Sequence, residues 1–365
     1  MSSKTIAVIC NYEIRPDRIG GMDRFYVAFN EKAKTQGCSV HWFFKGQSIF
    51  EFYKCLNITL TKDTPVESLF LKHLSENSYN YGYIITHFTE LCTSFYRDVK
   101  KKTGAYCIAV DHNPRPLEGF PLKKRLKLKV KGLLYGRYID LFIGVSKYTA
   151  THILKDYGGF LKPKVQVIYN GIDAEVYKRR EHSNTNRFMV ASHLRPSKGI
   201  LDLLMALSLL TKDEQSKLAV DIYGEGPIEN ELKQQCQSLD LNGFVSFKGS
   251  SPDLPALFCN YAFMIQPTYM ECFSLSILES LSANVPVITT QVGGNLEIIK
   301  DGVNGFVFNA GDIKALSKII SNIIDHKMTI KTPVDGDITS FYNLDRMVED
   351  HLDLVNRSSD EKDIG

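Results

Sequence analysis

Short apolar runs alternate with amphipathic stretches along the first half of the chain. An apolar run at 5–10 predicts a buried strand, a helical pattern follows over about 22–36, and a second run covers 39–44. This order predicts one βαβ unit. Further strands are predicted at 83–86, 105–110, 141–144 and 165–168, and a basic amphipathic helix at 123–138.

A polar, charged segment interrupts this alternation, which then resumes. Strands are predicted at 188–192, 218–223, 244–248, 263–266, 287–290 and 305–308, with helices between them. We therefore expect an α/β protein of two doubly wound Rossmann-like domains facing a cleft, with ligands at the carboxyl ends of the strands. The expected parts are an N-terminal domain at 1–170, a linker at 171–187, a C-terminal domain at 188–330, and a tail at 331–365 with a helix near 341–355.

Length and composition agree with a globular protein of two domains. The chain has 365 residues, more than one ordinary core accommodates. Its hydrophobic content of 44% and charged content of 23% are ordinary. No apolar run approaches the ~20 residues that span a bilayer, and the N-terminus has no signal-peptide pattern. The eight cysteines are scattered without Cys-x-x-Cys pairs, which favours reduced thiols in a cytoplasmic protein.

The small net charge of +3 hides an uneven distribution. Residues 1–170 carry 26 Lys and Arg against 14 Asp and Glu, a net +12, whereas residues 171–365 carry 18 against 27, a net −9. Such asymmetry indicates that the basic half meets something anionic.

The most informative motif is a pair of glutamates, Glu271 and Glu279, in a segment that predicts strand, loop and helix. Glu271 lies in the loop and Glu279 about two turns inside the helix. Between them, around Phe273, Ser274 and Leu275, lies the helix N-terminus, whose free N–H groups and dipole favour a diphosphate. Carboxylates on either side of an anion suit hydroxyl groups. A nucleotide sugar, with ribose, diphosphate and hexose in line, has this layout.

This segment resembles the donor site of the retaining family-4 glycosyltransferases of the bacterial surface-polysaccharide type, which have the GT-B fold. The Glu-x7-Glu spacing, the strand at 286–288 and the Gly293-Gly294 turn occur in the family's order. Two positions depart from it, because Cys272 stands where glycine is common and the helix ends near Asn284 rather than on glycine. Asn is the next best residue for a left-handed cap.

The resemblance implies a retaining hexosyl- or N-acetylhexosaminyltransferase that needs no metal or other cofactor. Its donor would be a nucleoside-diphosphate sugar, most often UDP-linked. Glu271 would hold sugar hydroxyls and Glu279 the ribose, while Lys198 and the helix N-terminus stabilise charge on the leaving diphosphate. The donor phosphate would accept the acceptor's proton in a same-face attack. By the same analogy, the last helix crosses back to the first domain.

Three further loops of the second half match places where the family binds its donor. Lys198 matches the family's lysine in a basic loop, but the usual arginine position holds His193, and Arg195 stands two residues further on. Either residue can contact the diphosphate. The Gly-x-Gly turn and the base pocket would be formed by Gly224, Gly226, Phe247 and Lys248.

The first half offers two candidate sites. Gly20 and Gly21 lie between the first strand and its helix, where glycine lets the backbone approach a phosphate. A flexible turn is the alternative. His112 follows a strand, and the resemblance places a histidine there near the reacting sugar; a structural loop histidine is the alternative.

The segment 123–131 combines six basic residues with three aliphatic ones. Such a helix suits an anionic membrane surface, with a solvated helix face as the alternative. Nucleic acid is not expected, because aromatic residues are not interleaved. We expect a glycan acceptor, such as a polyprenyl-diphosphate-linked sugar, at the inner face of the cell membrane. The residues assigned to membrane and acceptor are Lys123, Lys124, Arg125 and Lys127.

A second motif, Asp335-Gly336-Asp337, matches the Asp-x-Asp of metal-dependent glycosyltransferases. We reject it, because it falls in a polar loop near the C-terminus, where we expect solvated side chains. Two other functions stay open. An NAD(P)-dependent oxidoreductase fits the paired Rossmann pattern but lacks a full Gly-x-Gly-x-x-Gly. A nucleotide-binding interaction protein without catalysis is the other.

Overall fold

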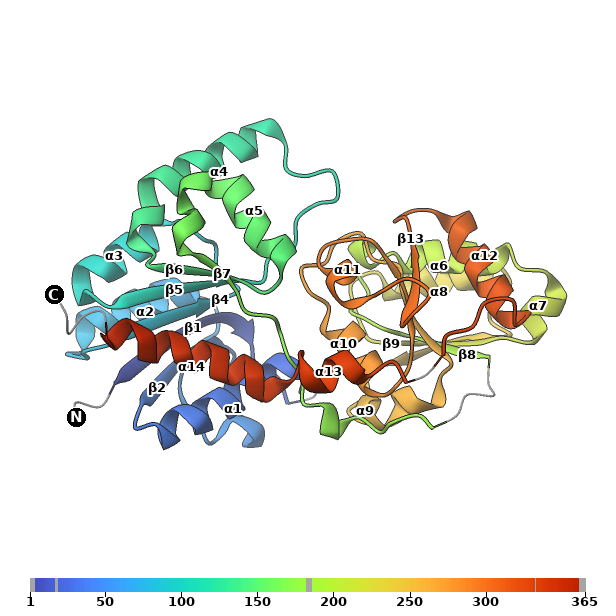
Figure 1. Ribbon diagram of the computed structural model, residues 1–365, viewed down its shortest axis with the longest axis horizontal. Helices are drawn as coiled ribbons and strands as arrows, with labels where there is room; N and C mark the ends of the chain where they lie inside the picture. The colour runs from blue at the N-terminus through green and yellow to red at the C-terminus, as the bar shows by residue number, and fades with distance from the viewer. Residues whose placement is uncertain (1–3, 17–18, 182–185, 332, 361–365) are drawn as a thin grey trace. The chain divides into compact units, whose positions relative to one another are not determined.

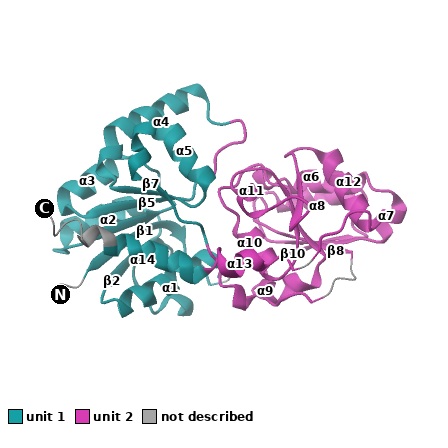
Figure 2. Ribbon diagram, viewed as in Figure 1, with its two compact units in different colours: residues 1–113, 119–170, 344–365 teal, residues 114–118, 171–343 magenta. Residues whose placement is uncertain are grey.

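The computed structural model describes residues 4–16, 19–181, 186–331 and 333–360. The chain forms two compact units, each built around a parallel sheet (Figure 2). Unit 1 contains residues 1–113, 119–170 and 344–365, and unit 2 contains residues 114–118 and 171–343.

Unit 1 has a seven-stranded sheet in the order β3-β2-β1-β4-β5-β6-β7, and each neighbouring pair is parallel. The order reverses at β1, which is the arrangement of a doubly wound sheet. The strands are β1 (Thr5–Glu13), β2 (Ser39–Lys45), β3 (Asn57–Thr61), β4 (Tyr83–His87), β5 (Tyr106–Asp111), β6 (Leu141–Gly144) and β7 (Val165–Val167).

Helices cover both faces of this sheet (Figure 1). On one face α1 packs against α14, which comes from the end of the chain. On the other, Ala7, Ile9 and Phe43 of the strands pack with Leu128 and Ile153 of the helices in one apolar core. The helices of unit 1 are α1 (Gly21–Thr35), α2 (Val66–Glu76), α3 (Ser94–Thr103), α4 (Leu122–Tyr135), α5 (Lys147–Tyr157) and α14 (Leu344–Asp360), with 3₁₀ turns η1 (Glu51–Tyr53), η2 (Gly136–Tyr138) and η3 (Gly159–Lys164).

Unit 2 repeats the plan with six parallel strands in the order β10-β9-β8-β11-β12-β13. Its strands are β8 (Arg187–Ala191), β9 (Ala219–Tyr223), β10 (Val245–Gly249), β11 (Phe263–Gln266), β12 (Val287–Thr290) and β13 (Gly305–Phe308). The helices are α6 (Ile200–Ser208), α7 (Lys212–Ser216), α8 (Glu229–Ser238), α9 (Leu254–Leu257), α10 (Leu275–Ser282), α11 (Asn295–Ile298), α12 (Ile313–Ile324) and α13 (Gly336–Ser340), with 3₁₀ turns η4 (Ala174–Val176), η5 (Pro196–Lys198) and η6 (Phe258–Asn260).

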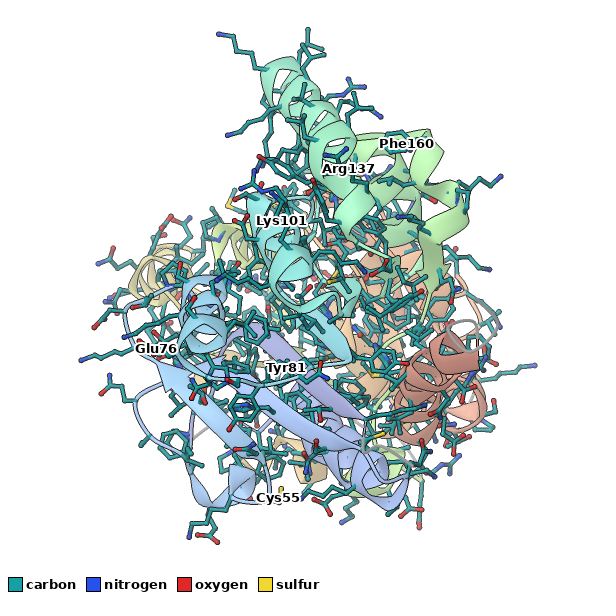
Figure 3. All side chains as sticks on the ribbon, turned by 90° about the vertical axis from the view of Figure 1, so that its left-hand side faces the viewer. Cys55, Glu76, Tyr81, Lys101, Arg137 and Phe160 are labelled. Carbon is teal, nitrogen blue, oxygen red and sulfur yellow. The ribbon has the colours of Figure 1, made fainter. Side chains whose placement is uncertain are left out.

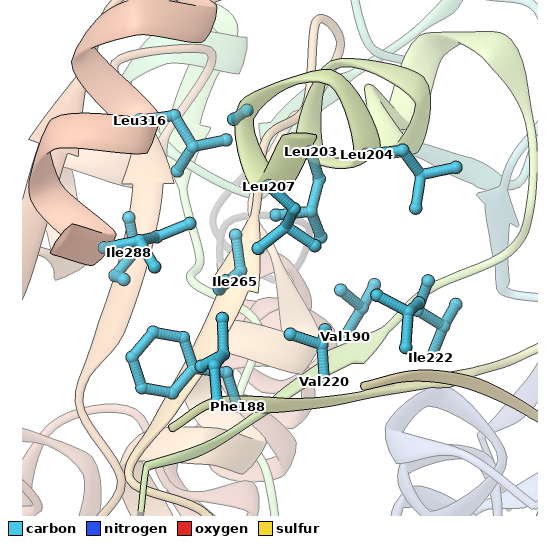
Figure 4. Close-up of a cluster of buried hydrophobic side chains, with 14 of the residues drawn as sticks. Phe188, Val190, Leu203, Leu204, Leu207, Val220, Ile222, Ile265, Ile288 and Leu316 are labelled. Atoms are coloured by element: carbon cyan, nitrogen blue, oxygen red, sulfur yellow. The ribbon is translucent and has the colours of Figure 1, made fainter. Parts of the chain in front are cut away.

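The core of unit 2 lies between the sheet and the helices α6, α8 and α12 (Figure 4). Val190, Ile222 and Ile265 from the strands face Leu204 and Leu207 of α6, and all five are fully buried. At roughly 2 kcal/mol for each fully buried aliphatic side chain, such a core fixes the positions of the strand ends that carry the loops described below.

The predicted fold class is confirmed, because both sheets are parallel and doubly wound. Several elements of unit 1 were not predicted, namely β3, α2, α3 and α5. The helix predicted at 341–355 begins later, at Leu344, and extends to Asp360. The cysteines are free thiols, as expected.

Candidate functional site

The loop between β11 and α10 carries the two motif glutamates. β11 ends at Gln266, and α10 begins at Leu275 with Ser274 as its N-cap, whose hydroxyl accepts from the Ile277 amide at 3.4 Å. Glu271 lies in the loop, and Glu279 is the fifth residue of α10. Glu279 is therefore about one turn inside the helix, not the two turns expected. The Leu275 and Ser276 amides begin the helix, where no intrahelical acceptor exists.

Glu271 forms an ion pair with Lys198, whose Nζ lies 2.7 Å from the Glu271 carboxylate. The Lys198 side chain is only 23% exposed and the Glu271 side chain only 13%, so water screens the pair less than it screens a surface pair. The structure thus brings together two predicted catalytic residues that lie 73 positions apart. A ligand that binds Lys198 has to share it with Glu271.

Close packing of two loops holds this pair in place. The Ser197 carbonyl accepts from the Tyr269 amide at 2.8 Å and from the Thr268 hydroxyl at 3.1 Å. Gly199 has φ +66°, and a Cβ there would lie 1.9 Å from the Pro267 carbonyl oxygen. Only glycine permits this approach, so the position of Lys198 depends on its neighbour.

A second close approach fixes the Glu271 loop from the side of β12. Gly293 has φ +65°, and a Cβ there would lie 2.0 Å from the Glu271 carbonyl oxygen. The next amide, that of Gly294, donates to the Cys272 carbonyl at 3.1 Å. The Gly-Gly turn of the motif therefore supports the glutamate loop directly.

A buried polar network beneath the N-terminus of α10 was not predicted. The side-chain amide of Gln266 donates to the Ser274 hydroxyl at 2.6 Å and to the Ser276 hydroxyl at 3.0 Å. Asn295 donates to the hydroxyl of Thr289 at 3.1 Å and to the Thr290 carbonyl at 3.2 Å. These residues connect the helix cap to β11 and β12. No local sequence signal marks them, because the contacts join separate loops.

The other residues at the cap have mixed surroundings. Phe273 is buried and its ring lies 5.4 Å from that of Tyr342, which makes it a packing residue of this loop. Leu275 and Glu279 are half-buried. Asn284 adopts φ +58° after α10, as expected for a left-handed cap, and its amide donates to the Arg180 carbonyl at 2.8 Å.

The Gly224–Gly226 turn packs against the loop that follows β8. A Cβ at Gly224 would lie 1.9 Å from the Ser192 carbonyl oxygen, and one at Gly226 would lie 2.2 Å from that of Leu194. His193 donates from Nδ1 to the Glu225 carbonyl, whereas Arg195 has an exposed side chain. His193 is thus used within the fold, and Arg195 extends outward from the same loop.

Lys248 is held by a buried carboxylate rather than standing alone. Its Nζ lies 3.3 Å from Asp221, which also pairs with Arg187 at 2.7 Å and accepts from Tyr261 at 2.8 Å. Burial raises the pKa of Asp221, but the hydrogen bonds from Tyr261, Arg187 and Lys248 outweigh it and the pKa is lowered. The neighbouring Phe247 is half-buried, with Lys233 over its ring at 5.9 Å.

In unit 1 the predicted phosphate loop is closed by an internal carboxylate. Gly20 is the N-cap of α1, and its amide donates to Asp23 at 2.7 Å. Asp23 is fully buried and also accepts from Tyr12 at 3.0 Å and from Tyr53 at 2.6 Å. Gly21 is the first residue of the helix. The Gly20 amide is therefore satisfied within the protein.

His112 belongs to a buried group of three histidines in unit 1. Its Nε2 lies 3.0 Å from Nδ1 of His87, and its ring stacks on Phe88 at 4.1 Å. Burial and nearby His351 lower the pKa of His112 to about 3, and burial lowers that of His351 to about 4. Burial, His112 and His351 together lower the pKa of His87. At neutral pH His112 is therefore an uncharged imidazole.

The Asp335–Asp337 segment differs from the predicted solvated loop. Asp337 lies in the short helix α13, with Asp335 at its N-cap. Asp335 is mostly buried and pairs with Arg179 at 2.5 Å, while the exposed Asp337 pairs with Lys300 at 2.8 Å.

Among the residues that the structure describes, no group of three or more His, Cys, Asp or Glu is placed to hold a metal ion. Within the same residues, no helix has the length and apolar character that crossing a bilayer requires.

Comparison with known families defines the class of this protein. Residues 19–176 match the family described as Glycosyltransferase Family 4, and residues 172–333 match the one described as Glycosyl transferases group 1. Both descriptions name glycosyltransferases, and together the two matches run from residue 19 to residue 333 of this chain. With two parallel doubly wound sheets, it belongs to the family-4 glycosyltransferases of GT-B fold. Both family descriptions favour a transferase over the oxidoreductase alternative.

Curated relatives match part of the chain. An uncharacterized glycosyltransferase of Methanocaldococcus jannaschii is 29% identical over 57% of this chain and 57% of its own length. The N-acetyl-alpha-D-glucosaminyl L-malate synthase of Bacillus anthracis is 28% identical over 40% of this chain and 41% of its own length. The chain thus spans about half the length of these relatives.

Solved structures match nearly the whole chain. The Anabaena HepE structure in complex with UDP-glucose has a TM-score of 0.76 at 19% identity, and the match covers 97% of this chain and 99% of that one. Sucrose-phosphate synthase from Thermosynechococcus elongatus has a TM-score of 0.78 at 13% identity, covering 98% and 100%. At these identities the likeness establishes the shared fold.

Gly293→Ala is expected to destabilise unit 2. The left-handed backbone alone costs about 1–2 kcal/mol with a Cβ, and the Glu271 loop must also move away. Urea unfolding measures the loss. Gly243→Ala is the matched control, because no atom lies within 4 Å of its Cβ and its φ is not positive; it should change stability by less than about 0.5 kcal/mol. Equal stability of the two variants would contradict the assigned role.

The cluster of His87, His112 and His351 predicts that the protein loses stability as pH falls below about 6.5. Each is neutral when folded and binds a proton when unfolded, so the unfolded state gains protons first. Each contributes up to about 1.4 kcal/mol per pH unit below its unfolded pKa. Urea unfolding at pH 7.5 and 5.5 measures the slope.

His351→Phe should reduce this slope, because it removes one titrating group from a site that already contacts the Phe25 ring at 5.0 Å. His326→Asn, at an exposed left-handed position, is the matched control for the loss of one histidine. An identical pH dependence in wild type and His351→Phe would show that His351 does not titrate on unfolding.

Proposed function

We propose that this chain transfers a hexosyl or N-acetylhexosaminyl group from a UDP-linked sugar to a glycan acceptor, with retention of configuration. The observation that carries the proposal is the Lys198–Glu271 ion pair beside the N-terminus of α10, with Glu279 one turn inside that helix. In this proposal the cation and the helix amides bind the diphosphate, and the two carboxylates bind the polyols on either side of it.

The assignment of a UDP-linked donor rests on chemistry and on relatives. Solved structures with the same fold are described as complexes with UDP, UDP with glucose, and UDP-glucose. The base would lie at the end of β10 beside Phe247 and Lys248, and the ribose hydroxyls at Glu279. Arg195 is the better diphosphate ligand of its loop, because the Nδ1 proton of His193 is used by the Glu225 carbonyl.

Catalysis in this proposal is electrostatic. Negative charge grows on the leaving diphosphate as the glycosidic bond breaks, and Lys198 with the first amides of α10 faces that charge. Glu271 orients the sugar hydroxyls and keeps Lys198 in place between turnovers. The acceptor hydroxyl attacks from the face that the diphosphate leaves and gives its proton to a donor phosphate oxygen. His112, neutral and held by His87, would orient the sugar by hydrogen bonding rather than by carrying charge.

Retention is supported by the products of relatives. UDP-hexoses of the common kind are α-linked, and the relatives include an N-acetyl-alpha-D-glucosaminyl L-malate synthase and a poly(glycerol-phosphate) alpha-glucosyltransferase. An α-linked product from an α-linked donor requires retention. Metal independence is part of the same proposal, because Lys198 and the α10 amides supply the positive charge that a metal supplies elsewhere.

The acceptor in this proposal is lipid-linked, such as a polyprenyl-diphosphate sugar used in polysaccharide assembly at the cytoplasmic face of the membrane. The support is the net +12 of residues 1–170. A structure of similar fold, WaaG, is described as a glycosyltransferase involved in lipopolysaccharide biosynthesis, with a TM-score of 0.67 at 15% identity.

Glu279→Ala should weaken UDP binding about ten- to a hundred-fold, because a carboxylate hydrogen bond to a hydroxyl is worth roughly 1.5–3 kcal/mol. Glu271→Gln should keep or tighten UDP binding, because it releases Lys198, yet it should lower sugar transfer. Titration calorimetry with UDP and UDP release from UDP-sugars measure the two effects. If Glu271→Gln alone abolished UDP binding, the assigned roles would be reversed.

Transfer should be unchanged after exhaustive chelation with EDTA. Asp337→Asn should also leave the rate unchanged, because Asp337 is an exposed partner of Lys300. Asp335 is unsuitable for this test, since its change removes a mostly buried partner of Arg179. An absolute requirement for added manganese or magnesium would overturn the proposed mechanism.

A further inference from the structure

Helix α4 turns its apolar stripe away from the protein. Its buried residues are Leu128 and Gly132, and a Cβ at Gly132 would lie 2.0 Å from the Tyr157 carbonyl oxygen of α5. This close contact fixes which side of α4 faces the core. The stripe on the far side consists of Leu122, Leu126, Val130 and Leu133, which are 68%, 58%, 53% and 67% exposed.

This arrangement is the reverse of an ordinary surface helix, whose apolar stripe faces the core. Leu122, Leu126 and Val130 follow each other at intervals of four residues, and Leu133 closes the row, so the four form one continuous strip. Leu134, 54% exposed, widens it at the C-terminal end. Figure 3 shows α4 at the outer edge of unit 1, with side chains projecting away from the protein. A contiguous exposed apolar strip indicates an interaction surface.

Basic side chains border the strip on both sides. At ~100° per residue, Lys123 and Lys127 fall along one border and Arg125 and Lys129 along the other. No acidic residue occurs between Glu118 and Asp140. In the described part of the chain no carboxylate pairs with Lys123, Arg125 or Lys127. Two other cations have internal roles: Lys131 pairs with Glu90, and Lys124 lies 3.8 Å over the Phe120 ring.

We propose that α4 lies in the interfacial layer of an anionic bilayer, with the four aliphatic side chains inserted among the acyl chains and the flanking cations at the headgroups. The inference rests on the proposed function only for the identity of the acceptor. An apolar strip between two basic borders is the pattern of a helix lying in a membrane surface. Binding therefore has an apolar part and an electrostatic part.

Other occupants fit this surface less well. A second copy of the chain would bring the same basic borders against each other around a two-fold axis, which repels. A nucleic acid would meet the cations but would leave the aliphatic strip facing a charged backbone. Anionic lipid satisfies both features at once.

The test is co-sedimentation with vesicles of phosphatidylglycerol and phosphatidylcholine, compared with phosphatidylcholine alone, at low and high salt. Wild type should bind the anionic vesicles, and part of the binding should persist at high salt because insertion is not screened. A charge variant should lose roughly tenfold or more at low salt. It carries Lys123→Gln, Lys124→Gln, Arg125→Gln and Lys127→Gln.

An apolar variant should lose the salt-resistant fraction while keeping weak, fully salt-sensitive binding. It carries Leu122→Gln, Leu126→Gln, Val130→Gln and Leu133→Gln. The matched control changes an exposed apolar row on unit 2, with Leu201→Gln, Met205→Gln and Leu209→Gln, and should bind as wild type does. Thermal unfolding of each variant shows that it is folded.

A fluorescent reporter makes insertion visible directly. The only tryptophan, Trp42, is fully buried, so its emission should not respond to vesicles. Val130→Trp adds one at the centre of the strip, and its emission should shift to shorter wavelength on anionic vesicles.

Three outcomes would overturn the proposal. The first is equal vesicle binding by wild type and the apolar variant, and the second is an unshifted Val130→Trp emission in vesicle-bound protein. The third is a wild-type protein that is dimeric in solution while the apolar variant alone is monomeric. Because vesicle binding is measured without donor or acceptor, a failure of sugar transfer leaves this test unaffected. The proposed function and the docking surface can therefore fail separately.

Discussion

Contact between backbones at the carboxyl ends of three parallel strands is the constraint on which the site of unit 2 depends. The loops after β8, β11 and β12 approach so closely that Gly199 touches the Pro267 carbonyl and Gly293 that of Glu271. A side chain at either glycine would push the loops apart. These contacts fix the two loops, and Lys198 and Glu271 therefore lie 2.7 Å apart. In this sense the ion pair follows from the glycines.

Buried polar groups are stabilised in more than one way in this protein. In unit 2, Gln266, Ser274 and Asn295 form a hydrogen-bonded network that holds the cap of α10 without any charge. In unit 1, His87 and His112 are kept neutral by burial, and the carboxylate of Asp23 is surrounded by hydrogen-bond donors. A network of neutral groups keeps its hydrogen bonds over a wide pH range. Buried imidazoles stay neutral in the folded state, and the folded state therefore becomes less stable as the pH falls.

The sequence predicted the fold class because short apolar runs and helical periodicity are local signals. It missed β3 and α2, because β3 is a half-buried edge strand and α2 buries only Val66 and Phe70. The motif predicted Glu271 and Lys198 but not their pairing, which requires two loops to meet. It also could not predict that Asp221 would hold Lys248. Such contacts join residues with no shared local pattern.

The origin of α14 has a consequence for how the protein is made. Unit 2 is built almost entirely from one continuous stretch, whereas unit 1 combines residues 1–113 and 119–170 with α14, which follows unit 2 in the chain. Buried residues of α14, Met347, Leu352 and Val355, complete the helix layer beside α1, and Lys32 pairs with Glu349 at 3.3 Å. On the ribosome, the first unit to begin synthesis is therefore the last to be finished. Until α14 has been synthesised, the side of α1 that packs against it is not yet covered.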